Sequence, residues 1–219
     1  DSKLVCRHLG ISRRTRTISG ALRRLGVYRL EPPALFAPRR LQERYAARRM
    51  NEDAQTDAFL DDLAGRGGRR LREGMAYYRI KHRLRMSLLY FQAEQENLAV
   101  LGTTNRSEWL TGFYVKWGDD SSDIEPLLHL YKSEIFNLAE LLEIPESIRS
   151  KAPSPDLVPG LTDEAAMQIS YQKLDRILIA KESGDAPPAD ASAEEIDRVD
   201  RILSAAKKRS LRNLSLPRP

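Results

Sequence analysis

Residues 98–112 read LAVLGTTNRSEWLTG, and this stretch decides the fold. The apolar run 98–101 is short enough for a buried strand, and Gly102 follows it at once as a turn residue. Asn105 is placed to cap the helix that follows, since its side-chain oxygen can accept from a backbone N–H of the first helical turn. In open α/β sheets, ligands bind beyond the carboxyl ends of strands, where helix N-termini offer free N–H groups. The stretch therefore predicts strand, turn and helix, with a ligand site at the turn.

The flanking sequence extends this pattern of alternating strands and helices. A second strand is predicted at 123–126, and a weak strand candidate lies at 14–19. Helices are predicted at 39–50, 71–94, 131–142 and 171–180, and after the cap residues Thr162 and Ser192. The fold class is α/β, with a mainly parallel, Rossmann-like open sheet flanked by helices. The predicted domains are an α/β domain at 1–180, a linker at 181–193, and a helix with a basic tail at 194–219.

The composition indicates a globular protein and argues against a membrane-spanning or secreted one. The chain has 219 residues, 41% apolar and 31% charged, which suits one globular domain. No apolar run approaches the ~18 residues of a membrane span, and no secretory signal opens the sequence. A single cysteine, Cys6, points to a reducing cytoplasm and a buried apolar role for its side chain. We expect no membrane partner.

Positive charge is concentrated at one end of the chain. The net charge is +5, but residues 1–50 alone carry +10, from twelve Arg, one Lys and three acidic residues. Such a segment is compatible with nucleic acid, a membrane surface or a phosphate-rich small ligand, or with an arginine-rich solvated surface. No base-reading motif or set of stacking aromatic residues accompanies it, so we expect no nucleic-acid partner.

Several polar residues are candidates for a site, and each has a structural alternative. Glu108 can complete a capping box with Asn105 or contact a ligand. Lys132 opens a helix, where a cation opposes the dipole, so it is either an exposed lysine or the partner of an anion. The polar loop 116–123 either presents groups to a ligand or is simply solvated. The histidines His8, His82 and His129 form no metal-binding spacing and are interpreted as structural.

Taken in order, the motifs resemble those of ammonia-dependent NAD⁺ synthetase, a family of the ATP-pyrophosphatase group. The motifs are RIKHRLRMSLLY (79–90), LGTTNRSEWLTGFYVKWGD (101–119), SDIEPL (122–127), LYKSEIFNLAELLEIPESI (130–148), KAPSPDLVPGLTDE (151–164) and KKRSLR (207–212). The resemblance spans about 70–209 and is faint at DSKLVCRHLGI (1–11). It implies a ligase that amidates deamido-NAD with ammonia through an adenylate, releasing AMP and pyrophosphate.

The resemblance also implies roles for individual residues. Lys132 and Glu108 are the expected catalytic residues, and Glu108 is also the expected Mg²⁺ ligand. Contacts to the co-substrate ATP are implied for Thr103, Lys132 and Ser154. Contacts to deamido-NAD are implied for Arg83, Lys116, Asp123, Lys207 and Lys208. A homodimer in the cytoplasm is the implied assembly.

The chain departs from the family pattern in four places. The family's phosphate loop, S-G-G-[IL]-D-S, does not occur in it, and the first residue is Asp1 rather than Met. We therefore expect an N-terminally truncated synthetase without its first strand, inactive as this chain alone. Arg79 stands where Asn is usual, His82 where Ala is usual, and Lys207 where His is usual; residues 20–70 match no family motif. The alternatives are another ligase of the same group, or a non-catalytic remnant whose basic half binds nucleic acid.

Overall fold

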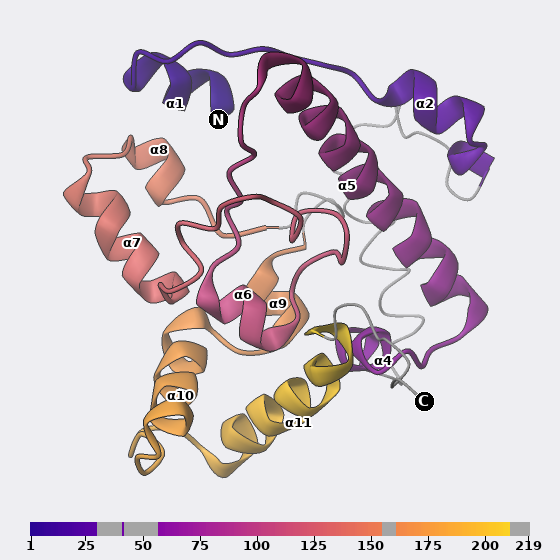
Figure 1. The fold of residues 1–219 in the computed structure, drawn as a ribbon. Helices are drawn as coiled ribbons and strands as arrows, with labels where there is room; N and C mark the ends of the chain where they lie inside the picture. Colours follow the sequence, from indigo (N-terminus) through magenta and orange to yellow (C-terminus); the bar gives the residue numbers. More distant parts are fainter. Residues whose placement is uncertain (30–40, 42–56, 155–160, 211–219) are drawn as a thin grey trace, which may run out of the picture.

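The computed structural model describes residues 1–29, 41, 57–154 and 161–210, apart from the side chains of Lys208 and Ser210. Helices dominate this part of the chain (Figure 1). They are α1 (Ser2–His8), α2 (Ser19–Arg24), η1 (Val27–Arg29), α4 (Ala58–Leu63), α5 (Arg69–Glu96), α6 (Arg106–Thr111), α7 (Lys132–Leu141), α8 (Glu146–Arg149), α9 (Asp163–Met167), α10 (Tyr171–Ser183) and α11 (Ala193–Ser210). The predicted helix at 39–50 falls outside the described residues except for Leu41.

Strand pairing in the described ranges is confined to one parallel bridge, between Leu101 and Ile124. Backbone hydrogen bonds flank it: the Gly102 N–H donates to the Ile124 carbonyl at 2.8 Å, and the Asp123 N–H donates to the Val100 carbonyl at 2.9 Å. The two segments predicted as strands thus pair in the predicted direction but do not form a sheet. The strand predicted at 14–19 is wrong, because its described backbone is unpaired and α2 begins at Ser19.

Local signals set the helix ends as the sequence predicts. The long predicted helix at 71–94 is α5, which ends at Asn97 in a left-handed conformation. The Thr162 hydroxyl accepts from the Ala165 N–H at 3.1 Å and caps α9. Ser192 and Glu195 form the predicted reciprocal cap at the start of α11. These contacts link residues three positions apart, so neighbouring sequence is enough to specify them.

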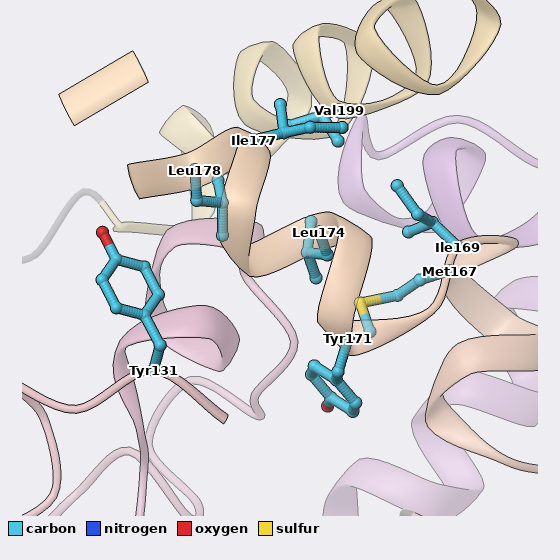
Figure 2. Packing of buried hydrophobic residues seen from close by; sticks show 8 residues of the cluster. All are labelled: Tyr131, Met167, Ile169, Tyr171, Leu174, Ile177, Leu178 and Val199. Atoms are coloured by element: carbon cyan, nitrogen blue, oxygen red, sulfur yellow. The ribbon is translucent and has the colours of Figure 1, made fainter. Parts of the chain in front are cut away.

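The main core lies where α10 packs against α7, α6 and α11 (Figure 2). Its buried side chains are Tyr131, Met167, Ile169, Tyr171, Leu174, Ile177, Leu178 and Val199. The apolar stripe predicted on the last helix supplies Val199, Ile202 and Ala206, all buried. Because α11 also packs on α4 and α6, it holds α6, which begins directly after the predicted ligand-binding turn. No helix in the described ranges is both long and apolar enough to span a bilayer.

Candidate functional site

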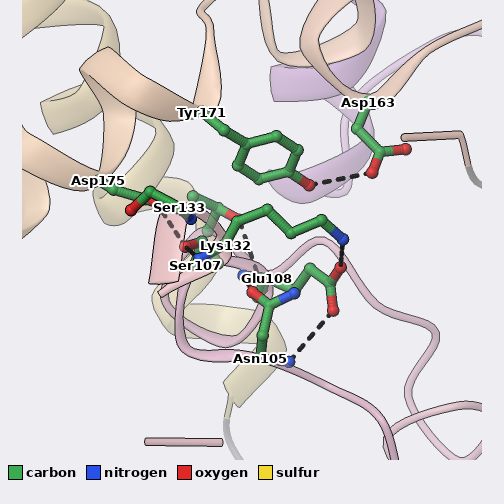
Figure 3. Close-up of polar contacts among 9 residues, drawn as sticks. Asn105, Ser107, Glu108, Lys132, Ser133, Asp163, Tyr171 and Asp175 are labelled. Carbon is green, nitrogen blue, oxygen red and sulfur yellow. Dashed lines mark hydrogen bonds and ion pairs between the residues drawn. The ribbon is translucent and has the colours of Figure 1, made fainter. Parts of the chain in front are cut away.

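A carboxylate and an ammonium group meet at the start of α6 and α7. Lys132 Nζ lies 3.1 Å from Glu108 Oε1, and each side chain is 18% exposed (Figure 3). The second carboxylate oxygen, Glu108 Oε2, accepts from the Asn105 N–H at 3.2 Å, while the Glu108 N–H donates to Asn105 Oδ1 at 3.0 Å. Glu108 therefore completes a capping box and faces Lys132 at the same time. The capping interpretation of Glu108 is confirmed, and its contact with a ligand stays a prediction.

A buried carboxylate from α10 fixes the positions of both helix starts. Asp175 Oδ2 accepts from the Ser133 N–H at 2.7 Å, and Asp175 Oδ1 accepts from the Ser107 hydroxyl. The Ser107 oxygen in turn accepts from the Lys132 N–H at 2.9 Å. Burial raises the pKa of Asp175, although the hydrogen bonds from Ser107 and Ser133 oppose that shift. This bridge sets the spacing between the backbones that carry Glu108 and Lys132.

Asp163, at the start of α9, adds a second buried carboxylate beside this pair. It is only 4% exposed, and its Oδ2 accepts from the Tyr171 hydroxyl at 3.0 Å. Its other oxygen, Oδ1, is buried and has no hydrogen-bond partner among the described residues. Burial raises the pKa of Asp163, while the Tyr171 hydrogen bond and the charge of Lys132 lower it by less. Lys132 Nζ also lies 5.4 Å from the centre of the Tyr171 ring.

Sequence reasoning missed both Asp163 and Asp175. Each lies in a helical stretch where an aspartate is typical of an exposed face or a first helical turn. The apolar periodicity around Asp175, with Leu174, Ile177 and Leu178, was the available signal, because it places one acidic residue at the edge of a core-facing stripe. A buried carboxylate needs hydrogen-bond donors, so an aspartate at this position indicates a structural bridge to neighbouring elements.

A second group of predicted residues gathers where α5 meets the loop after α6. Arg83 Nε donates to the Lys116 carbonyl at 3.2 Å, which places the two residues side by side. Nearby, a surface hollow of about 180 Å³ is lined by Tyr90, Trp109, Tyr114, Lys116, Trp117 and Arg209, among others. The Trp109 and Tyr114 rings are stacked, with centres 5.2 Å apart and planes 12° apart. The hollow thus combines aromatic faces with two cationic residues and with the acidic residues Asp120 and Glu125.

Asp123 occupies the strand-like segment beside this hollow. Its Oδ2 accepts from the Val100 N–H at 2.7 Å, and its Oδ1 accepts from the Tyr90 hydroxyl at 3.2 Å. Burial and the hydrogen bond to Asp123 raise the pKa of Tyr90. In the structure Asp123 therefore holds the parallel pair together and binds Tyr90, which lines the hollow.

The remaining predicted residues lie around these two groups. Thr103 is exposed in the turn between Gly102 and Asn105. Gly102 leaves room there for the Glu125 carboxylate, which lies 2.3 Å from the position of a Cβ atom and would have to move for any larger residue. The Ser154 hydroxyl donates to the Leu161 carbonyl at 2.9 Å and so joins the two ends of the loop whose residues 155–160 are outside the description. Lys207 is exposed on α11, and the Lys208 side chain is outside the described part.

Comparison with solved structures identifies the class of this fold. The chain superposes on the NMN synthetase of Francisella tularensis with a TM-score of 0.64 and 27% identity, covering 97% of this chain and 69% of that one. It superposes on the NH₃-dependent NAD synthetase of Campylobacter jejuni with a TM-score of 0.53 and 27% identity, covering 65% and 56%. The fold is therefore that of the NAD and NMN synthetases, an α/β class, and the described residues contain a single parallel bridge of it.

Sequence comparison then gives the particular family. The family model described as NAD synthase matches residues 48–212, and the chain belongs to this family. It is 51% identical over 208 residues to the NH(3)-dependent NAD(+) synthetase of Thermotoga maritima, covering 95% of this chain and 73% of that protein. Its identity to the NH(3)-dependent NAD(+) synthetase of Coprothermobacter proteolyticus is 41%, covering 85% and 64%. The resemblance noted in the sequence is confirmed.

Proposed function

We propose that this protein amidates deamido-NAD with ammonia at the expense of ATP, which yields NAD⁺, AMP and pyrophosphate. Family membership and 51% identity to an NH(3)-dependent NAD(+) synthetase support this activity. The structural observation that carries it is the Glu108–Lys132 pair, held at 3.1 Å by a cap and a buried carboxylate bridge. A fixed carboxylate and ammonium suit chemistry on a phosphate with its counter-ion.

The reaction has two steps. The nicotinate carboxylate oxygen attacks the α-phosphorus of ATP, the bond to the β-phosphate oxygen breaks, and pyrophosphate leaves. Ammonia then attacks the acyl carbon of the adenylate, a proton is released, and AMP departs with the carbon–oxygen bond electrons. The first step is needed because a free carboxylate has no good leaving group. Both steps need stabilisation of charge on phosphate oxygens.

The ATP side of the site is assigned to the turn and the helix starts. Lys132 contacts the phosphates as negative charge builds on them, with Thr103 and Ser154 as hydroxyl contacts. Tyr171 and Asp163 restrict Lys132 from the α9–α10 side, since the ring lies 5.4 Å from Nζ. When pyrophosphate leaves, Lys132 is the ammonium positioned to receive the developing charge.

Magnesium fits this side of the site through Glu108. Among the described residues no cluster of three or more His, Cys, Asp or Glu side chains could by itself hold a metal. Mg²⁺ bound with a nucleotide needs only one or two protein carboxylates, because phosphate oxygens and water fill the remaining positions. Glu108, a hard oxygen ligand at the helix start, would hold it, and the bound ion would neutralise phosphate charge.

The acceptor side is assigned to the hollow beside α5. Arg83 and Lys116, joined by the hydrogen bond from the Arg83 guanidinium to the Lys116 backbone carbonyl, supply positive charges for the dinucleotide's phosphates, and Asp123 supplies acceptor oxygens. Lys207 and Lys208 are assigned to the same ligand from the end of α11. The stacked Trp109 and Tyr114 rings give the hollow a flat apolar wall, which suits an aromatic ring of the ligand.

Turnover requires more than these residues. The S-G-G-[IL]-D-S phosphate loop, to which the family resemblance assigns backbone N–H groups for the ATP phosphates and a second metal carboxylate, does not occur in the 219 residues. We propose that the 219-residue chain binds its acceptor but does not turn over.

Helix α5 offers an apolar surface to a second subunit, because it exposes Leu88, Leu89 and Phe91. This surface is in line with a homodimer. We place the enzyme in the cytoplasm.

The test compares acceptors by calorimetry. Deamido-NAD should bind the 219-residue chain more tightly than nicotinic acid mononucleotide, the acceptor that a likeness to NMN synthetase makes the second candidate. Tighter binding of the mononucleotide would transfer the proposal to that substrate, and no binding of either would refute it. A pyrophosphate-release assay with ATP, Mg²⁺ and ammonium should show no turnover, so robust amide formation would contradict the proposed need for the phosphate loop.

A further inference from the structure

His82 departs from the family pattern and lies where α5 meets the loop that carries Lys116. Its side chain is 16% exposed, and Nδ1 lies 3.1 Å from Asp119 Oδ1. The other ring nitrogen, Nε2, is buried and has no hydrogen-bond partner among the described residues. The family's usual Ala could not make the contact with Asp119. This histidine therefore brings an interaction that the family motif does not predict.

Asp119 connects several segments of the candidate site. Its Oδ1 also accepts from the Val115 N–H at 3.0 Å, which closes the turn 115–119. Its backbone carbonyl accepts from the hydroxyl of Thr104 at 3.3 Å, next to the capping residue Asn105. A group that holds Asp119 therefore affects both the Lys116 turn and the turn that leads into α6.

The turn 115–119 needs such support because its conformation is constrained. Trp117 has a φ of +62°, a left-handed conformation that costs energy for a large side chain. The neighbouring Gly118 packs so tightly that a Cβ atom there would lie 2.9 Å from the Cβ of His82. Strained turns persist only where surrounding contacts hold them. Helix α5 holds this turn at both ends, through Arg83 at Lys116 and through His82 at Asp119.

We propose that His82 is a positioning residue for the acceptor: its Nδ1–H holds Asp119, which fixes the 115–119 turn so that Lys116 stays beside Arg83. The assignment rests on the proposed function, because Lys116 and Arg83 are the residues given to deamido-NAD. His82 itself need not touch the ligand. Its effect is to hold the backbone of Lys116 against the Arg83 guanidinium before the dinucleotide arrives, which lowers the ordering cost of binding.

Two substitutions separate positioning from simple packing. His82→Leu still fills the site with a side chain but removes the hydrogen-bond donor. His82→Asn restores an N–H close to the Nδ1 position. By calorimetry on the 219-residue chain, His82→Leu should weaken deamido-NAD binding about tenfold, as expected for a lost hydrogen bond to a charged group. His82→Asn should recover most of that loss. The control is His8→Leu, which changes an exposed histidine on α1 and should bind like the wild type.

The outcomes distinguish this proposal from the proposed function. If the wild type binds deamido-NAD and His82→Leu binds equally well, the positioning role is overturned while the function stands. An Asn variant as weak as the Leu variant also overturns it, because packing would then explain the loss. If the wild type itself does not bind, the proposed function fails and the positioning role fails with it.

A spectroscopic measurement tests the geometry without any ligand. The chain has three histidines, so ¹⁵N-histidine spectra can be assigned with the His82 and His8 variants. Holding Asp119 requires a proton on Nδ1, whereas free neutral imidazole favours the proton on Nε2. We expect a protonated Nδ1 for His82. A neutral ring protonated only at Nε2 would overturn the proposal whatever the binding results.

Discussion

Glu108 and Lys132 form an ion pair with a 3.1 Å contact although 24 residues separate them in the chain. Neither side chain reaches the other by local helix geometry, since they open two different helices. The Asp175 bridge from α10 joins those helix starts through Ser107 and Ser133. The pair therefore depends on a third helix that contributes no residue to the predicted site. This relationship and the other contacts of the site give five predictions.

Removal of the Asp175 carboxylate should destabilise the fold. Asp175 accepts two hydrogen bonds while fully buried, and Ser107 must donate to it because its oxygen already accepts from Lys132 N–H. Asp175→Ala leaves these donors unsatisfied and should lower the free energy of unfolding by about 2–4 kcal/mol in urea. Asp175→Asn, which can accept only one of the two, should cost about half as much. The exposed Asp185→Asn is the control, and an Ala variant as stable as this control would contradict the bridge.

Neutralising Asp163 should stabilise the protein at neutral pH. Burial raises the pKa of Asp163, so the folded state keeps this proton at pH values where the unfolded chain has lost it. Wild-type stability should therefore fall as pH rises from about 3.9, the ordinary carboxyl pKa, through the raised folded pKa. Asp163→Asn escapes that loss and can still accept from Tyr171. Its Tm should exceed the wild-type value by a few degrees at pH 7 and match it near pH 3; a lower Tm at pH 7 would refute the argument.

The coupling between Glu108 and Lys132 is measurable by a double-mutant cycle. The variants are Glu108→Gln, Lys132→Met and their combination, and the readout is the free energy of unfolding. A partly buried pair should give a coupling energy of about 0.5–3 kcal/mol. The exposed pair Arg69–Glu73, substituted in the same way to Met and Gln, should give a clearly smaller coupling energy, because solvent screens both charges. Equal couplings in the two cycles would mean that the site pair is not specially held.

Loss of the Arg83 guanidinium should affect the acceptor and leave the fold intact. Arg83 is exposed, and its guanidinium donates to the Lys116 carbonyl, so Arg83→Ala removes little packing. We expect the deamido-NAD dissociation constant to rise about tenfold, with Tm nearly unchanged. Arg70→Ala, on the same helix and also exposed, should leave the affinity as it is. If both variants bind equally, Arg83 has been given the wrong role.

Substitution by alanine should change the stability of the protein in opposite directions at two glycines whose surroundings differ. At Gly118 a Cβ atom would lie 2.9 Å from the His82 Cβ and 3.0 Å from the Val115 carbonyl oxygen, so Gly118→Ala should cost about 1–3 kcal/mol. At Gly74, inside α5, a Cβ atom would meet nothing within 4 Å, so Gly74→Ala should stabilise by about 0.5–1 kcal/mol. Thermal unfolding of both variants checks the pair. A neutral Gly118→Ala would show that the 115–119 turn does not pack tightly on α5.

The sequence predicts the helix starts of the site, whereas it predicts the strands beside them only in part. The Asn105–Glu108 cap, the start of α7 at Lys132 and the cap at Thr162 all follow from residues within one helical turn. The apolar run at 98–101 predicts a strand, a second strand is predicted at 123–126, and the structure pairs the two segments at a single bridge. A strand needs partners to persist, and an apolar run carries no information on whether those partners are present.

The sequence by itself determined the family, the helix ends and most of the residues assigned to ATP and deamido-NAD, because motif order and hydrogen bonds between near neighbours are properties of the chain alone. Only the tertiary structure decided that Asp175 joins the starts of α6 and α7, that Asp163 is buried beside Lys132, and that His82 holds Asp119. Those contacts arise when α10 and α11 bury their apolar faces and when α5 packs on the loop after α6. The polar groups drawn in with those faces lose water and must find partners far away in the sequence.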